Sequence, residues 1–261
     1  MKNKPTILIT NDDGFTAPGI RVLINVAKEF GDVIIVAPDK PQSGMGHAIT
    51  VNEPLRFQET DYYGNDVKAY HCSGTPVDCI KMGIYILKGK IPDLILSGIN
   101  HGSNVSTNVL YSGTMSAAVE GALEGIPSIG FSLTDYSVNA DFSASIIVIK
   151  EIISKSLSNK IEQGICLNVN IPNVPYNKIK GIKVCRQGRA FWDDTFDERE
   201  DPLGKKYYWL TGSFEQHEQA TDTDVHYLSN NFVTIVPTQF DMTAHKTINE
   251  INKWGFESVN T

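Results

Sequence analysis

The sequence predicts an α/β protein with three layers (αβα), in which helices cover both faces of a mostly parallel, doubly wound sheet. Two observations lead to this fold class. Short apolar runs lack the polar alternation of half-exposed strands, so they are typical of strands buried on both faces. Amphipathic helical patterns lie between these runs, so strand and helix alternate through the first half of the chain.

The predicted strands and helices follow one another in a regular order. Each strand is bounded by turn residues, and the runs comprise residues 6–10, 33–38, 93–97, 128–133, 165–171 and 232–237. Apolar residues at helical spacing or good helix formers predict helices over residues 18–30, 77–87 and 114–124. Because the carboxyl ends of parallel strands meet at one edge of a sheet, we expect ligands to gather there.

The segment from about residue 186 to 231 is polar and aromatic and loses this alternation. A segment this long without periodicity is not a plain loop, so we interpret it as a protruding, β-rich arm. It could be a surface excursion, an oligomer contact or a cover for the active site, and the sequence leaves these alternatives open. We expect one domain over residues 1–261, with a core mainly within 1–185 and a returning strand and tail over 232–261.

The composition excludes several classes of protein. Lys and Arg number 23 against 30 Asp and Glu, a net charge of -7, and no basic run could neutralise several phosphates of a nucleic acid. No stretch approaches the roughly 18 apolar residues of a membrane span, and the run after Lys2 and Lys4 is too short for a signal peptide. We therefore expect a cytoplasmic protein without a membrane or nucleic-acid partner. The four cysteines lack C-x-x-C spacing and are interpreted as free and structural.

Two adjacent carboxylates, Asp12 and Asp13, stand where the first predicted strand ends. The sequence Asn11-Asp12-Asp13-Gly14 also suits an ordinary turn, because Asn and Asp bond their own backbone and Gly accepts positive φ. The pair alone therefore does not decide between a turn and a site.

Further oxygen ligands follow two other strands. Ser43 lies in a loop after the second strand, and Asn100 follows the strand 93–97. Two carboxylates, a hydroxyl and an amide oxygen suit Mg²⁺, Mn²⁺ or Ca²⁺ better than structural zinc. His101 could be an added ligand or acid, although a lone loop histidine is more often a bystander. The Gly44-x-Gly46 pair lacks the third glycine of a dinucleotide fingerprint, which disfavours a dehydrogenase.

The segment Ser112-Gly113-Thr114 precedes the helix predicted to start near Thr114. Ser or Thr at this place normally caps the helix, and the free N–H groups and helix dipole can also form a phosphate site. Glu120 and Glu124 lie four residues apart on this helix, and we interpret them as solvated or structural rather than as ligands.

Taken together, these segments closely resemble the SurE family of survival protein E type 5'/3'-nucleotidases. The resemblance rests on Ile9-Thr10-Asn11-Asp12-Asp13-Gly14, Pro38-x-x-x-Gln42-Ser43-Gly44-x-Gly46, Cys72-Ser73-Gly74-Thr75-Pro76-Val77-Asp78-Cys79, Ser97-Gly98-Ile99-Asn100-x-Gly102-x-Asn104, Tyr111-Ser112-Gly113-Thr114, Leu167-Asn168-Val169-Asn170-Ile171-Pro172, Thr221-Asp222-x-Asp224 and Val233-Thr234-Ile235-Val236-Pro237. It covers nearly the whole chain. The departures are local: family members often carry an acidic residue near Asn108, and Val-Gly where this chain has Met115-Ser116.

The resemblance implies a Rossmann-like core and a phosphatase for nucleoside 5'- and 3'-monophosphates, with polyphosphate activity in some members. It implies one divalent metal per subunit, Mg²⁺ or Mn²⁺, and dimers or tetramers built through the arm and tail. The implied metal ligands are Asp12, Asp13, Ser43 and Asn100.

We expect water to attack phosphorus in line, with Asp12 and Asp13 as ligands and Asp13 also orienting the water. Asn104, Ser112, Gly113 and Thr114 are expected to bind the phosphate. An aspartyl-phosphate route through Asp12 would resemble haloacid-dehalogenase-type phosphatases, which place the second acid two residues on, whereas here the acids are adjacent. A nucleotide-binding sensor with negligible turnover is the alternative from another class, because binding and turnover can use the same ligands.

Overall fold

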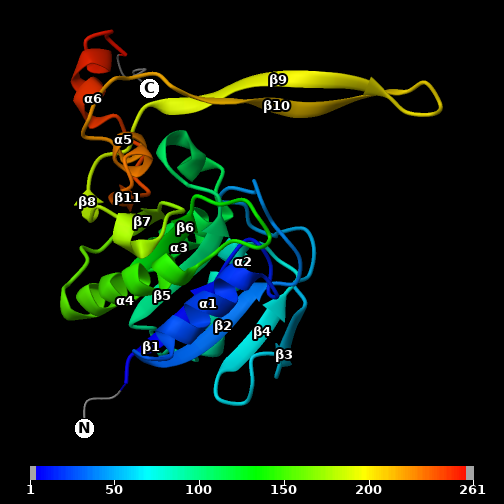
Figure 1. The fold of residues 1–261 in the computed structure, drawn as a ribbon, viewed down its shortest axis with the longest axis vertical. Coiled ribbons are helices and arrows are strands. Elements are labelled where there is room, and N and C mark those ends of the chain that lie inside the picture. The colour runs from blue at the N-terminus through cyan, green and yellow to red at the C-terminus, as the bar shows by residue number, and fades with distance from the viewer. Residues whose placement is uncertain (1–3, 257–261) are drawn as a thin grey trace, which may run out of the picture.

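The computed structural model describes residues 4–256 and contains a nine-stranded sheet (Figure 1). Its strands are β1 (Thr6–Thr10), β2 (Asp32–Pro38), β3 (Phe57–Thr60), β4 (Lys68–Cys72), β5 (Leu94–His101), β6 (Ser128–Leu133), β7 (Ile165–Ile171), β8 (Ile182–Val184) and β11 (Val233–Gln239). They lie in the order β3-β4-β2-β1-β5-β6-β7-β11-β8. The strands from β4 to β7 in this order are parallel, whereas β3 and β11 pair antiparallel with β4 and β7. The predicted, mostly parallel α/β sheet is confirmed.

Helices cover both faces of this sheet. They are α1 (Pro18–Ala27), α2 (Pro76–Ile86), α3 (Gly113–Leu123) and α4 (Ser143–Ser158), with α5 (Asp224–Ser229) and α6 (His245–Asn252) near the C-terminus and short 3-10 turns η1 (Ser106–Leu110) and η2 (Tyr176–Lys178). Along β1, Ile7 and Ile9 pack into the core that α1 and α4 share, whereas Leu8 packs into the core beneath α2 and α3. The alternating side chains of one buried strand therefore belong to two cores, as three layers require.

Local sequence signals account for the helix ends. Pro18 stands at the first position of α1, Thr75 and Asp78 form a capping box at the start of α2, and Ser112 caps α3. The first helix ends at Ala27 rather than at the predicted residue 30. The chain turns there towards Gly31, where a Cβ would lie 2.2 Å from the Pro5 carbonyl oxygen, so only glycine allows this approach.

Strand β1 lies between β2 and β5. The chain adds β2 and β4 on one side of β1 and then crosses to add β5, β6 and β7 on the other side, so the strand order reverses next to β1. Doubly wound sheets bind ligands in the crevice that such a reversal opens at the carboxyl ends of the strands. β5 continues to His101 instead of ending at the predicted residue 97, with an irregular register between Ser97 and Asn100. Asn100 therefore lies at the carboxyl end of the strand itself, beside the end of β1.

The predicted arm contains a long hairpin. Strands β9 (Ala190–Glu200) and β10 (Lys206–Gln216) form a separate antiparallel sheet that projects from the body (Figure 1, yellow). The protruding β-rich arm is confirmed. The returning strand was predicted over 232–237, and as β11 it inserts between β7 and β8.

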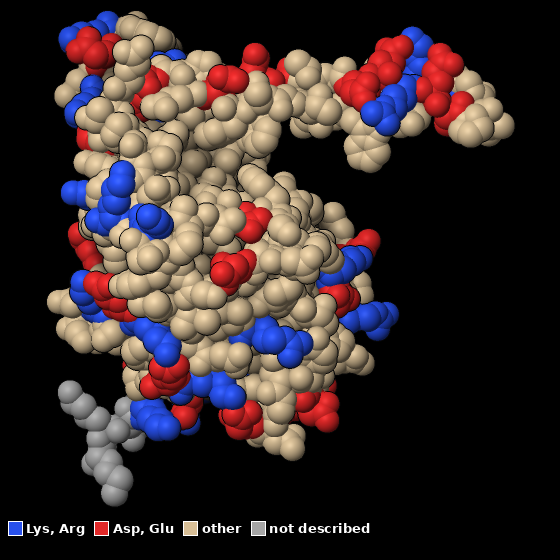
Figure 2. Space-filling model, viewed as in Figure 1, with Lys and Arg blue, Asp and Glu red and all other residues tan. Residues whose placement is uncertain are grey.

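Charged groups are distributed without a large basic surface on the face that Figure 2 shows. Acidic and basic side chains are interspersed over the body, and both kinds gather on the outer part of the hairpin. Within residues 4–256, no helix combines the length and apolar character needed to cross a membrane. All four cysteines are free, as predicted, and Cys72, Cys79 and Cys166 are buried.

Candidate active site

Asp12 and Asp13 begin the site at the carboxyl end of β1. Asp12 is 4% exposed, and one carboxylate oxygen accepts a hydrogen bond from the hydroxyl of Thr114 on α3. Asp13 is partly exposed and accepts the backbone N–H of His101 at 3.3 Å. Asn11 donates its side-chain amide to the Gly14 carbonyl at 2.9 Å, so the segment is also a turn. The turn and the site are therefore properties of the same residues.

The electrostatics of this pair favour a positive charge nearby. Burial, with the Asp13 carboxylate as the second cause, raises the pKa of Asp12 to about 6. Burial also raises the pKa of Asp13, and the bond from the His101 backbone offsets part of this. Two adjacent carboxylates that are costly to ionise are stabilised by a cation, which removes both their repulsion and the cost of burial.

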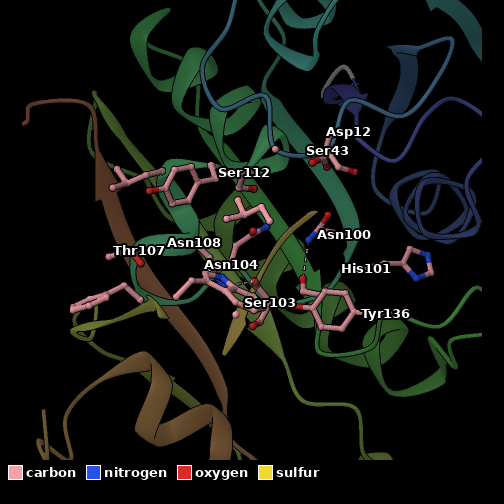
Figure 3. A pocket seen from close by; sticks show the side chains of 18 of the residues that line it. Asp12, Ser43, Asn100, His101, Ser103, Asn104, Thr107, Asn108, Ser112 and Tyr136 are labelled. Atoms are coloured by element: carbon pink, nitrogen blue, oxygen red, sulfur yellow. Dashed lines mark hydrogen bonds between the residues drawn. The ribbon is translucent and has the colours of Figure 1, made fainter. Parts of the chain in front are cut away.

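Ser43 and Asn100 bring two neutral oxygens to the same cavity as the carboxylates (Figure 3). The loop that carries Ser43 is fixed to the end of β1, because the Gln42 N–H donates to the Asp12 carbonyl at 2.7 Å. Asn100 donates its side-chain N–H to the Gly102 carbonyl at 2.7 Å, which leaves its Oδ1 as the free acceptor. All four predicted metal ligands line one cavity of about 1040 Å³.

Within the part of the chain that the structure describes, no cluster of three or more His, Cys, Asp or Glu side chains could hold a metal. A cation at this site would therefore depend on the hydroxyl and the amide oxygen beside the two carboxylates. Such an all-oxygen set fits Mg²⁺, Mn²⁺ or Ca²⁺. The imidazole of His101 packs edge-on against Phe142 with ring centroids 5.4 Å apart, and in Figure 3 it points away from Asn100.

The N-terminus of α3 packs directly against Asp12. At Gly113 an added Cβ would lie 2.6 Å from the Asp12 Cβ, so a larger residue would displace the carboxylate. Thr114 is fully buried, and its hydroxyl donates a hydrogen bond to Asp12. The predicted contact of Thr114 with phosphate stays a prediction, since its hydroxyl donates to Asp12 in this structure.

Ser112 and Asn104, the other predicted phosphate-binding residues, line the cavity. The Ser112 hydroxyl accepts the Met115 N–H at 3.0 Å and so caps α3, as the ordinary role of such a residue predicts. Asn104 is buried, and its side-chain amide donates to the hydroxyl of Ser132 at 2.8 Å. Both are held in place by the scaffold before any ligand binds.

Sequence reasoning missed part of the cavity wall. Tyr136, Thr107, Asn108 and several residues of the hairpin, including Trp192, also line the cavity. The aromatic character of the arm was visible in the sequence, but its position at this cavity depends on tertiary packing far from the strand ends.

Comparison with known proteins shows similarity over nearly the whole chain. A family model described as "Survival protein SurE" matches residues 7–194. The "5'-nucleotidase SurE" of Christiangramia forsetii is 55% identical over 254 residues, covering 97% of this chain and 98% of the relative. The protein of the same name from Cytophaga hutchinsonii is 54% identical over 256 residues, with 97% and 98% covered.

A solved structure is similar over nearly the whole length as well. The crystal structure of the SurE protein from Aquifex aeolicus superposes with a TM-score of 0.83 at 40% identity, covering 96% of this chain and 99% of that one. On the family model and these relatives, the chain belongs to the survival protein SurE family.

Proposed function

We propose that this chain is a phosphatase that hydrolyses nucleoside 5'-monophosphates to nucleoside and inorganic phosphate. One observation carries the proposal: three strand ends place Asp12, Asp13, Ser43 and Asn100 in one cavity against the N-terminus of α3. The names of the relatives, 5'-nucleotidase SurE at 55% and 54% identity, support the same reaction. A carboxylate site next to a helix N-terminus suits a substrate that is held through a cation and through N–H donors together.

A divalent cation, Mg²⁺ or Mn²⁺, is part of this proposal. Asp12, Asp13, Ser43 and Asn100 would hold it, and the raised pKa of Asp12 and the free Oδ1 of Asn100 support that assignment. When bound, such a cation stabilises the negative charge of the phosphoryl group and makes water more acidic.

The other steps, which are binding the phosphate and orienting the attacking water, are assigned to residues of the chain. Ser112 and Asn104, which line the cavity, bind the phosphate together with the N–H of Gly113, which packs against Asp12. Thr114 orients Asp12 through its hydroxyl. Asp13 is more exposed than Asp12 and orients the attacking water. The water oxygen forms a bond to phosphorus as the bond from phosphorus to the ester oxygen breaks, and the nucleoside leaves as the alcohol after taking up a proton.

The size of the cavity supports a wider range of phosphate compounds. Its volume of about 1040 Å³ lies at the upper end for small-molecule sites, so it has room for nucleoside 3'-monophosphates and for part of a polyphosphate chain. We include both in the proposed substrates.

Assembly through the arm and tail as a homodimer or homotetramer is also proposed. Phe196 and Trp209 on the hairpin and Trp254 after α6 expose 59% to 71% of their surface, which is unusual for large apolar side chains. Light scattering of the intact chain measures the assembly. The cytoplasmic location stays a prediction.

The test is phosphate release from AMP and p-nitrophenyl phosphate, with and without EDTA and after Mg²⁺ or Mn²⁺ is restored. Asp13→Asn should keep its circular dichroism spectrum and lose at least about 100-fold in turnover, as expected for the loss of a positioned catalytic group. Asp39→Asn, an exposed acid after β2 outside the cavity lining, is the matched control and should match the wild type. Full activity in EDTA would contradict the metal, and an unimpaired Asp13→Asn variant would place the site elsewhere. A protein that binds AMP but releases no phosphate would be a sensor.

A further inference from the structure

The cavity has two chemically different ends. Asp12, Asp13 and Asn100 supply polar groups to the lining, here called the polar end, whereas Trp192 and Leu210 from the hairpin supply apolar surface. Figure 2 shows this hairpin overhanging the body from one side. A nucleoside monophosphate has the same division, with a charged phosphate at one end and a flat aromatic base at the other.

Trp192 is held in a fixed orientation while much of its ring stays accessible. Its indole N–H donates to the Asn108 side-chain oxygen at 3.0 Å, and Asn108 in turn donates to the Ser103 carbonyl at 3.3 Å. Phe214, its partner in the β9–β10 ladder, packs edge-on with ring centroids 5.9 Å apart. Trp192 nonetheless remains 43% exposed. A polar edge that is already bonded leaves the ring face for a ligand.

The hairpin base is joined firmly to η1, which also lines the cavity. The Ser106 hydroxyl lies 2.7 Å from the Ala190 carbonyl and accepts the Ala190 N–H at 2.7 Å. The Thr107 hydroxyl donates to the same carbonyl at 2.8 Å. Asp224 accepts the backbone N–H of Ser106 at 2.8 Å and that of Gly188 at 2.7 Å. Trp192 comes two residues after the buried Ala190, so its position is set by the body rather than by the free end of the arm.

We propose that Trp192, oriented by Asn108, is the base-binding residue of this site: the nucleobase stacks on the indole while the phosphate lies at the carboxylate end. The inference rests on the proposed phosphatase function and names its substrate class. Stacking on an aromatic ring tolerates every base, because each base has a π face. The site therefore favours nucleotides over phosphate esters that lack a base, with little discrimination among bases.

The test compares AMP with ribose 5-phosphate, which carries a hydroxyl in place of the base. In Trp192→Ala, the ratio of kcat/KM for AMP to that for ribose 5-phosphate should fall about 5- to 140-fold, the range given by loss of one base-stacking contact. The loss should lie mainly in KM, since stacking binds the ground state and the transition state alike. Trp192→Phe should retain most of the ratio. Phe196→Ala, on the exposed hairpin outside the cavity lining, is the control and should leave it unchanged.

Equilibrium binding keeps the test independent of turnover. Calorimetric titration of AMP and ribose 5-phosphate into the same variants, each also carrying Asp13→Asn to suppress hydrolysis, should show that the preference for AMP is lost in Trp192→Ala. AMP should also quench the wild-type tryptophan fluorescence, and the quenching should persist in Trp209→Phe but disappear in Trp192→Phe. An unchanged AMP preference in Trp192→Ala, or equal losses for both ligands, overturns the inference. Absence of phosphate release with an intact AMP preference would overturn the phosphatase function and leave the base contact standing.

Discussion

Replacing Glu120 by glutamine tests a buried ion cluster that joins the Ser43 loop to α3. The Glu120 side chain is 5% exposed and lies 2.9 Å from Nε2 of His47, four residues after Ser43, and it also pairs with the Lys81 ammonium of α2. The hydrogen bond with His47 lowers the pKa of Glu120, and the bond with Lys81 contributes further. The carboxylate is therefore stabilised by the Lys81 ammonium and by a hydrogen bond with the His47 ring, which approach it from different elements.

The expected loss can be worked from these contacts. A hydrogen bond to a charged group contributes about 1.5 to 3 kcal/mol. Lys81 is 46% exposed, so water replaces Glu120 at the ammonium at little cost. Glutamine keeps the volume of the side chain and can still bond His47 as a neutral group. We therefore expect Glu120→Gln to lower the free energy of unfolding by about 1 to 3 kcal/mol, with about 2 to 4 °C in Tm for each kcal/mol.

The dependence on pH has a definite sign. The pKa of Glu120 in the folded protein lies below its ordinary value of 4.5, so its stabilisation is complete above that pH. It is lost as the pH falls through the lowered folded pKa, where the carboxylate of the wild type takes up a proton. Glutamine has no such proton. The difference between wild type and Glu120→Gln should therefore be full near pH 7 and shrink below about pH 4.5.

Urea unfolding at several pH values measures this difference directly. Glu124→Gln is the matched control, because Glu124 lies one turn later at the C-cap of α3 and is exposed. Its unfolding free energy should stay within about 0.5 kcal/mol of the wild type. A stabilising role of the Glu120 carboxylate is refuted if both variants unfold alike at neutral pH, or if the deficit of Glu120→Gln is the same at low pH as at neutral pH.

Two further substitutions test the contacts around the site and the arm. Gly113→Ala would place a methyl group 2.6 Å from the Asp12 Cβ. We therefore expect kcat/KM for AMP to fall at least about tenfold and the free energy of unfolding to fall by about 1 to 3 kcal/mol. Wild-type kinetics in this variant would show that the helix can shift without disturbing Asp12. Asp224→Asn sets an N–H group against the backbone N–H of Ser106 or of Gly188. It should therefore lower the free energy of unfolding by about 1 to 3 kcal/mol and speed proteolysis at the hairpin base. The control Asp222→Asn, at an exposed residue, should change the free energy of unfolding by less than about 1 kcal/mol, and equal proteolysis of both variants would contradict the role of Asp224.

The sequence predicted the parallel strands β1, β2, β5, β6 and β7 because each carries an unbroken apolar signal. It missed the parallel strand β4, whose residues Lys68–Cys72 mix polar and apolar side chains and are only partly buried. It missed β3, whose residues Phe57–Thr60 are exposed or half-exposed and form no apolar run at the edge of the sheet. α4 was missed for another reason, since Val148, Ile149, Ile152 and Ile153 do recur at helical spacing. That signal was present in the sequence and simply was not assigned.

The polar end of the site was predictable because its residues follow strands. Asp12, Ser43 and Asn100 each follow or end a parallel strand, and the topology of a doubly wound sheet brings such positions to one edge. No comparable rule applies to Trp192, which lies on a hairpin outside the main sheet. Its place in the cavity depends on the bonds between η1 and the hairpin base, which join residues more than 80 positions apart in the sequence.

Helix α3 links the two halves of the proposed metal site. Its first turn holds Asp12 through Thr114, and two turns later Glu120 holds the loop of Ser43 through His47. Both contacts come from one helix, whose mostly buried side chains pack against the body. The same rigid element therefore positions the carboxylate of Asp12 and the loop that carries the Ser43 hydroxyl. Positioning by a common helix explains why residues from separate strand ends can keep one geometry without bonding one another directly. A catalytic site needs such support, because small displacements of its groups reduce the rate strongly.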